Sequence, residues 1–150
     1  MTDTVHFSTS LPDPETQPEF YAGVPTKRAL AWIVDILVIT LFTLLAGIVT
    51  LTMAWFAWPL TFIAIGLVYR IGTIAQGSAT WGMRLLGLEF RAHDGRRLDP
   101  IQSALHVGGY YAAMTFVLPQ IASVIAVLAT PRRQGLCDLI LGTTALNRPD

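Results

Sequence analysis

The sequence predicts an all-α membrane protein with about three transmembrane helices and a small cytoplasmic β-hairpin between the second and third spans. Two observations predict this fold class. Of the 150 residues, 53% are hydrophobic and only 13% are charged, which is too little charge to cover the surface of a soluble domain of this size. The apolar residues are also gathered into long uncharged runs, and a spanning helix needs about 20 such residues.

The first two helices are predicted from one continuous run. From Ala29 to Tyr69 the chain contains a single charged residue, Asp35. This run is about twice the length that one crossing requires, so we expect two helices at about 29–52 and 58–75, joined by a tight turn. Trp55 and Trp58 stand in the turn, as indole rings do at headgroup depth.

The third apolar segment runs from Ile101 to Thr130. Asp99 is a suitable N-cap for it, and Pro100 suits the first helical position. Pro119 interrupts the segment. Our first expectation is one kinked span over about 101–130, because the two halves are too short for two full crossings. A re-entrant hairpin broken at Pro119 is the alternative.

The basic residues indicate the orientation. Lys27 and Arg28 precede the first span, the turn between the first two spans has no Lys or Arg, and five arginines lie at positions 70–97. The positive-inside rule therefore predicts that the N-terminus and the 76–100 loop are cytoplasmic. A third full span would place Arg132 and Arg133 outside, whereas a re-entrant hairpin keeps all ten basic residues inside.

The middle loop has a strand pattern of its own. Residues 86–98, LGLEFRAHDGRRL, alternate in polarity and carry Asp94-Gly95 at the expected tip of a β-hairpin. Residues 143–147 could add a third strand, which requires both segments on one side of the membrane. Residues 1–26, rich in acids and prolines, are expected to be a flexible cytoplasmic tail, with residues 27–147 forming the transmembrane domain.

Three segments, in this order, resemble the RDD family of bacterial membrane proteins, which is named for one arginine and two aspartates. They read TKRALAWIVD from Thr26, TWGMRLLGL from Thr80 and RQGLCDLILGT from Arg133. The resemblance implies that Arg28, Asp35 and Asp138 are the naming residues and that the protein lies in the bacterial inner membrane as a multi-pass protein. Met83 and Cys137 depart from the usual pattern, where Lys and His are common, and His106 stands near a frequent arginine.

Asp35 is the strongest candidate for chemistry. An ionised carboxylate within hydrocarbon costs about 2.5–3.5 kcal/mol on insertion scales, so it should face the helix bundle and have a partner. Arg28 lies two helical turns earlier on the same face, roughly 10 Å away. Asp35 could alternately bind a proton and a cation, or it could form a structural ion pair with Arg28 or Arg70.

The other candidates are weaker. Asp138 is expected to have a structural role, such as a contact with Arg28. Arg70 is a snorkelling anchor or the alternative partner of Asp35. His106 could relay protons, but a hydrogen bond to a neighbouring helix is the simpler interpretation. Cys137 has no candidate base beside it and is expected to be inert.

Two functions of different classes remain open. A net charge of zero argues against nucleic acid as a partner, and no motif of an enzyme, metal site or cofactor is present, so we expect none of these. The first hypothesis is an accessory or assembly subunit of a membrane complex, in contact with lipid and with a protein partner. The second is a small homo-oligomeric exchanger of monovalent cations and protons that uses Asp35.

Overall fold

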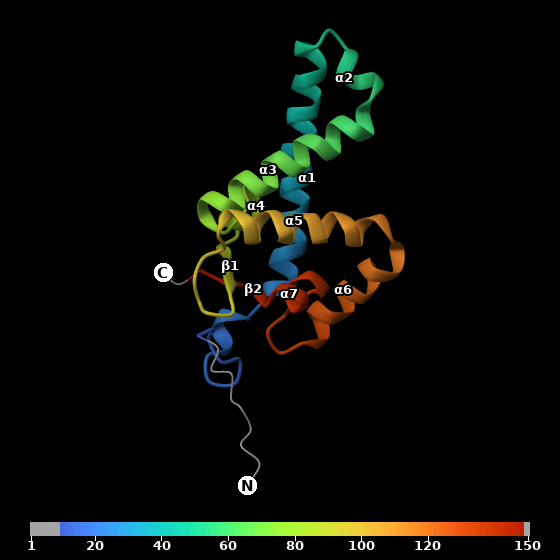
Figure 1. Ribbon diagram of the computed structural model, residues 1–150. Coiled ribbons are helices and arrows are strands. Elements are labelled where there is room, and N and C mark those ends of the chain that lie inside the picture. Colours follow the sequence, from blue (N-terminus) through green and yellow to red (C-terminus); the bar gives the residue numbers. More distant parts are fainter. Residues whose placement is uncertain (1–9, 149–150) are drawn as a thin grey trace.

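The computed structural model describes residues 10–148, which form a long helical hairpin whose base is packed against shorter helices and a two-stranded sheet (Figure 1). The elements in chain order are η1 (Pro18–Phe20), α1 (Val24–Val49), α2 (Met53–Phe56), α3 (Trp58–Gly77), α4 (Trp81–Leu85), β1 (Leu88–Ala92), α5 (Pro100–Thr115), α6 (Val117–Ala129), α7 (Leu136–Leu141) and β2 (Thr143–Asn147).

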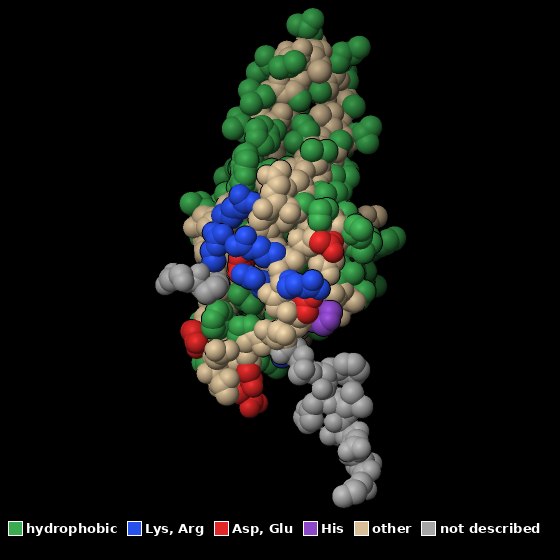
Figure 2. Space-filling model, turned by 60° about the vertical axis from the view of Figure 1, so that its left-hand side comes forward, with side chains coloured by type: hydrophobic (Ala, Val, Ile, Leu, Met, Phe, Trp, Pro, Cys, Tyr) green, Lys and Arg blue, Asp and Glu red, His purple; other side chains and the backbone are tan. Residues whose placement is uncertain are grey.

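The long helices α1 and α3 confirm the first two predicted spans. Their 26 and 20 residues give lengths of about 39 and 30 Å, enough to cross the hydrocarbon core. Both are long and apolar enough to span a membrane. The short helix α2 fills the turn between them, at the end of the hairpin far from the sheet (Figure 1). On the face shown in Figure 2, this end presents only apolar and uncharged surface.

One face of α1 is buried along its whole length. The residues on it recur at every fourth position and include Ala31, Asp35, Ile39, Thr43 and Gly47. This spacing places them in one stripe on the helix. The aspartate therefore faces protein, while most of the remaining surface of α1 consists of exposed apolar side chains.

The third apolar segment is a pair of helices. The axes of α5 and α6 differ by 120°, and the break is at Phe116, whose backbone is extended, three residues before the expected position. Pro119 lies in the first turn of α6, where its missing N–H leaves no hydrogen bond unmade. The described chain thus has two candidate spans, or three if the bent pair counts as one, and this bend favours the re-entrant alternative.

The small predicted sheet is confirmed in part: the strand expected at 143–147 is present, but the second strand of the expected hairpin is not. β1 pairs with β2 in antiparallel register, with Phe90 opposite Ala145, whereas residues 96–98 form no strand. Gly95 does form the predicted turn, with φ of +78°, a conformation that favours glycine. The sheet joins the chain before α5 to the chain after α7, so both ends of the α5–α6 hairpin lie on one side of the molecule.

The segment before α1 packs on the sheet. Leu11 and Tyr21 form a small buried cluster with Leu146 of β2, and the side-chain amide of Asn147 donates to two carbonyls of this segment. Residues 10–23, which were assigned to the tail, are therefore in contact with the domain. Residues 1–9 of that tail lie outside the described residues.

Candidate functional site

Asp35 lies at the junction of α1, α3 and α4 and is 2% exposed. Its Oδ1 accepts hydrogen bonds from the Tyr69 hydroxyl at 2.7 Å and from the backbone N–H of Gly82 at 2.9 Å. Its Oδ2 accepts from the Thr80 hydroxyl at 2.7 Å. Nη1 of Arg70 lies 3.9 Å from Oδ2, beyond hydrogen-bond distance. Three donors from the protein thus hold a carboxylate whose nearby cation is at ion-pair distance but makes no hydrogen bond with it.

The donors to Asp35 are themselves fixed by the start of α4. Thr80 is the N-cap of this helix and accepts the backbone N–H of Met83 at 3.2 Å, as N-cap threonines do. The Tyr69 hydroxyl accepts the backbone N–H of Trp81 at 3.1 Å while it donates to Asp35. The carboxylate therefore binds an N-terminal helix turn, which favours negative charge, and connects α1 to both α3 and α4.

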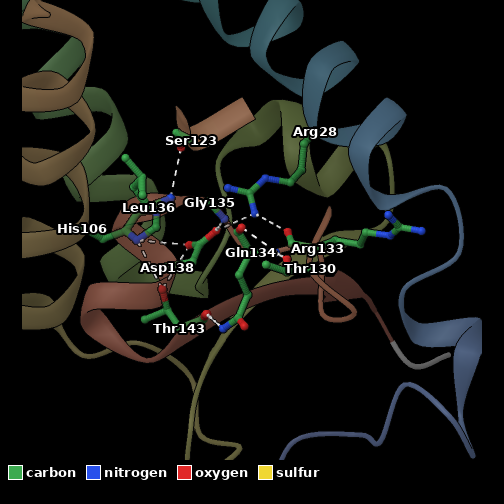
Figure 3. Close-up of polar contacts among 10 residues, drawn as sticks. All are labelled: Arg28, His106, Ser123, Thr130, Arg133, Gln134, Gly135, Leu136, Asp138 and Thr143. Carbon is green, nitrogen blue, oxygen red and sulfur yellow. Dashed lines mark hydrogen bonds and ion pairs between the residues drawn. The ribbon is translucent and has the colours of Figure 1, made fainter. Parts of the chain in front are cut away.

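Asp138 forms a second buried centre at the N-terminus of α7 and is 1% exposed (Figure 3). Nη1 of Arg28 donates to its Oδ2 at 2.6 Å, and the backbone N–H of Gly135 donates to the same oxygen at 2.9 Å. The Thr143 hydroxyl donates to Oδ1 at 3.1 Å, and Nδ1 of His106 lies 3.6 Å from that oxygen. The centre joins α1, α5, α7 and β2.

The pKa of Asp138 reflects these contacts. Burial works against the charged carboxylate and raises its pKa, but the nearby charge of Arg28, together with His106 and the N–H of Gly135, outweighs burial and holds the pKa below the usual value. Asp138 is therefore ionised at neutral pH and forms a salt bridge with Arg28. Arg28 also donates to the carbonyl of Arg133 at 3.3 Å.

Glu89 on β1 is a third buried acid, 1% exposed. Its Oε1 accepts from Nε of Arg91 at 2.7 Å and pairs with Nη2 of the same residue. Arg97 and Arg148 lie 4.0 and 3.8 Å from Oε2, which has no hydrogen-bond partner within the described residues. Three arginines thus surround one carboxylate. Lys and Arg side chains gather on the face of the molecule shown in Figure 2.

A cavity of about 550 Å³ lies between α1 and α6 and is bounded also by α3 and α5. Asp35, Arg28, Arg70 and His106 line it together with a larger number of apolar side chains. The cavity therefore places charged groups from both carboxylate centres beside a mostly apolar space. Within residues 10–148, no three side chains of His, Cys, Asp or Glu are grouped so that they could hold a metal ion.

The structure divides the predicted site residues between two centres. Arg28, Asp138 and His106 meet at one, and Asp35 and Arg70 meet at the other. Of the two partners considered for Asp35, Arg70 is the nearer, and Arg28 pairs with Asp138 as anticipated. Cys137 is a free thiol on α7 next to the second centre.

Sequence reasoning missed several functional groups. Tyr69 and Thr80 donate to Asp35, and Thr143 donates to Asp138. Thr80 carried a usable signal, because a threonine before a short helical segment is a common N-cap. Glu89 also carried a usable signal, because it is an acid between two apolar residues, Leu88 and Phe90, in a strand pattern. Neither signal identifies the partner residue, because Thr80 is 45 residues from Asp35 in the chain.

In the comparison with known families, the model of the RDD family matches residues 22–142. The match includes Arg28, Asp35 and Asp138, so it covers both carboxylate centres. Comparisons with curated proteins and with solved structures gave no match.

Proposed function

Because the chain belongs to the RDD family, a family of membrane proteins, we propose that it is a non-catalytic accessory or assembly subunit of a membrane complex. The supporting observation is the environment of Asp35, whose two oxygens are occupied by three donors of the protein. A transporting carboxylate exchanges its ligands in each cycle, and this one would first have to break buried hydrogen bonds. In this proposal Asp35 is structural and connects α1, α3 and α4.

The surface of the helical hairpin supports a role in assembly. Large apolar side chains are exposed along α1 and α3, among them Leu37, Leu41, Ile48 and Val68, which are between 55% and 76% exposed. Exposed apolar surface of this extent is covered by lipid or by another protein. The proposed partners are the bilayer and either a second copy of the chain or a different membrane protein.

The polar end supports a cytoplasmic orientation in the bacterial inner membrane. The hydrogen bond of 2.7 Å between Lys27 and Asn147 and the β1–β2 ladder bring the start of α1, the 76–100 loop and the C-terminal strand together. Basic side chains near a cytoplasmic leaflet are attracted to anionic lipid. We place the N-terminal segment, the loop and β2 on that side, where the arginines around Glu89 would contact headgroups or a partner.

Exchange of monovalent cations for protons by a homo-oligomer is the second candidate. The observation in its favour is that Asp35 lines the cavity next to Arg70. A carboxylate beside a cavity can bind an ion that enters it. The positive charge of Arg70 would favour the ionised form of this carboxylate. This function would need a state in which Asp35 has lost the three donors seen here.

Flux through proteoliposomes separates the two candidates. Proton movement would be recorded after addition of sodium, potassium or lithium, with wild type, Asp35→Asn and the matched control Asp94→Asn, whose carboxylate pairs only with Arg96 in the described structure. We expect no cation-dependent flux from any of the three. Flux that is lost in folded Asp35→Asn and retained in Asp94→Asn would overturn the proposal in favour of exchange.

The assembly role is tested by site-specific photo-cross-linking in the native membrane. A photo-reactive residue is placed in turn at the exposed positions 37, 41, 48 and 68. The control position is Ile39, which is fully buried on the opposite stripe of α1. We expect a discrete protein adduct, with a second copy or with another membrane protein, from position 37 and none from position 39. Adducts with lipid alone at positions 37, 41, 48 and 68 would contradict an assembly role for this surface.

A further inference from the structure

The cavity between α1 and α6 contains an arginine whose hydrogen-bonding capacity is only partly used. The side chain of Arg70 is 9% exposed and lines the cavity. Its Nε is fully buried and has no hydrogen-bond partner within the described residues. A buried donor without an acceptor is destabilising, so a ligand acceptor that a small rotation of the guanidinium brings within reach would be stabilised at this position.

The neighbours of Arg70 leave part of its hydrogen-bonding capacity free. Asp35 takes its hydrogen bonds from Tyr69, Thr80 and Gly82 and forms an ion pair with the guanidinium at 3.9 Å, without a hydrogen bond to it. The guanidinium instead stacks on the Tyr110 ring, with Cζ 4.9 Å from the ring centroid. Arg28, the other arginine of the cavity, differs in this respect because it is bound to Asp138.

The rest of the cavity is suited to an acyl chain. The wall that α6 contributes consists of the apolar Val124, Val127 and Leu128 and the polar Gln120 and Ser123, and no described residue of this helix is buried. A volume of about 550 Å³ lies within the range of small-molecule and cofactor sites, about 300–1,000 Å³. Because the exposed side of α6 is apolar, a molecule dissolved in the bilayer can reach this helix.

We propose that this cavity binds an acidic amphiphile, a single acyl chain with a carboxylate or phosphate head, with the head on Arg70 and the chain against α6. A guanidinium binds either head through paired, charge-assisted hydrogen bonds. The inference does not depend on the proposed function, since a subunit without transport activity and an exchanger could both hold such a ligand.

The test is native mass spectrometry of the full chain in a neutral detergent. Oleate, 1-oleoyl lysophosphatidate and methyl oleate are each titrated as probes. The variants are Arg70→Gln and the cavity-filling Val127→Phe. Their matched controls are Arg84→Gln, which lies outside the cavity, and Ile125→Phe, on the exposed side of α6. Thermal unfolding of each variant verifies that it is folded.

We expect saturable binding of one molecule of an acidic probe, weakened by about tenfold or more in Arg70→Gln and in Val127→Phe and unchanged in both controls. Which acid binds more tightly identifies the head as carboxylate or phosphate. Equal binding of methyl oleate, or wild-type binding by folded Arg70→Gln, would overturn the proposal. If Arg70→Gln does not fold, the affinities of Arg70→Lys and Val127→Phe for the acidic probes are compared with wild type instead. Wild-type affinity in Val127→Phe would then overturn the proposal.

Discussion

The backbone N–H of Gly82 donates to Oδ1 of Asp35 at 2.9 Å, and this contact is available because position 82 has no side chain. A Cβ at this position would lie 2.3 Å from the carbonyl oxygen of Ala31 and 2.8 Å from Oδ1 of Asp35. The absence of a side chain allows α4 to approach the backbone of α1. The glycine is thus as much a part of the Asp35 centre as the hydroxyl donors are.

Gly82→Ala should therefore destabilise the protein. The new methyl group would push α4 away from α1 and lengthen the hydrogen bond to Asp35, at a cost of about 1–3 kcal/mol. The measurement is thermal or denaturant unfolding in detergent. Gly72→Ala is the matched control, because a Cβ at position 72 meets nothing within 4 Å and alanine favours the helix. Equal stability of the two variants would contradict the close approach.

Arg28→Ala should be among the most destabilising single substitutions. It would leave the carboxylate of Asp138 buried without its cation, which typically costs about 3–5 kcal/mol. The combination with Asp138→Asn should recover part of this loss, because the uncompensated charge is then removed. Arg96→Ala is the control, since the pair of Arg96 with Asp94 is on the surface and its loss should not be detectable. Unfolding of wild type, Arg28→Ala, Asp138→Asn and the double variant, with Arg96→Ala beside them, would show whether the losses are non-additive.

The contribution of Asp138 to the stability of the fold should change with pH only under acidic conditions. Burial raises its pKa but Arg28 and its other partners lower it further, so the folded value is below the unfolded value of about 3.9. The contribution is then fully present above about pH 5 and is lost as the pH falls through the folded pKa. The melting temperature of wild type minus that of Asp138→Asn should be constant at neutral pH and shrink below about pH 4. A difference that grows on acidification would contradict the assignment.

The apolar pattern predicted α1 and α3 because the length and hydropathy of a span are local properties of the chain. It also predicted that Asp35 faces protein, since a lone charge in hydrocarbon requires a partner. Arg70, one of the two cations considered, is at ion-pair distance from Asp35, but the hydrogen-bond donors were not identified. Tyr69 and Thr80 are ordinary residues in the sequence, and they meet Asp35 only because α3 and α4 fold back onto α1.

The sheet illustrates the same limit. Alternation around Phe90 predicts a strand, and Asp94-Gly95 predicts a turn, and both are present. A strand pattern carries little information about which segment pairs with it, and a local hairpin is the default expectation. Residues 143–147 were expected only as a third strand, and their direct pairing with β1 in place of a hairpin strand is non-local, so the local pattern did not predict it.

Cys137 should react slowly with thiol reagents at neutral pH. Burial raises the pKa of its thiol, and the neighbouring Asp138 raises it further, which lowers the fraction of reactive thiolate. The alkylation rate measured between pH 7 and 10 should therefore remain low at pH 7.5 and rise steeply at higher pH. An exposed cysteine, Arg96→Cys in a Cys137→Ser background, is the reference. Equal rates at pH 7.5 would contradict the raised pKa.

The α5–α6 hairpin predicts that both of its ends are on the same side of the membrane. The axes of the two helices differ by 120°, and the strands that flank them are paired. Single cysteines in the Cys137→Ser background can be placed before the hairpin with Arg96→Cys, after it with Pro131→Cys, and between α1 and α3 with Met53→Cys. An impermeant maleimide added to oriented vesicles should label positions 96 and 131 from one face and position 53 from the other. Labelling of position 131 together with position 53 would instead establish a single kinked span, and Arg132 and Arg133 would then lie outside.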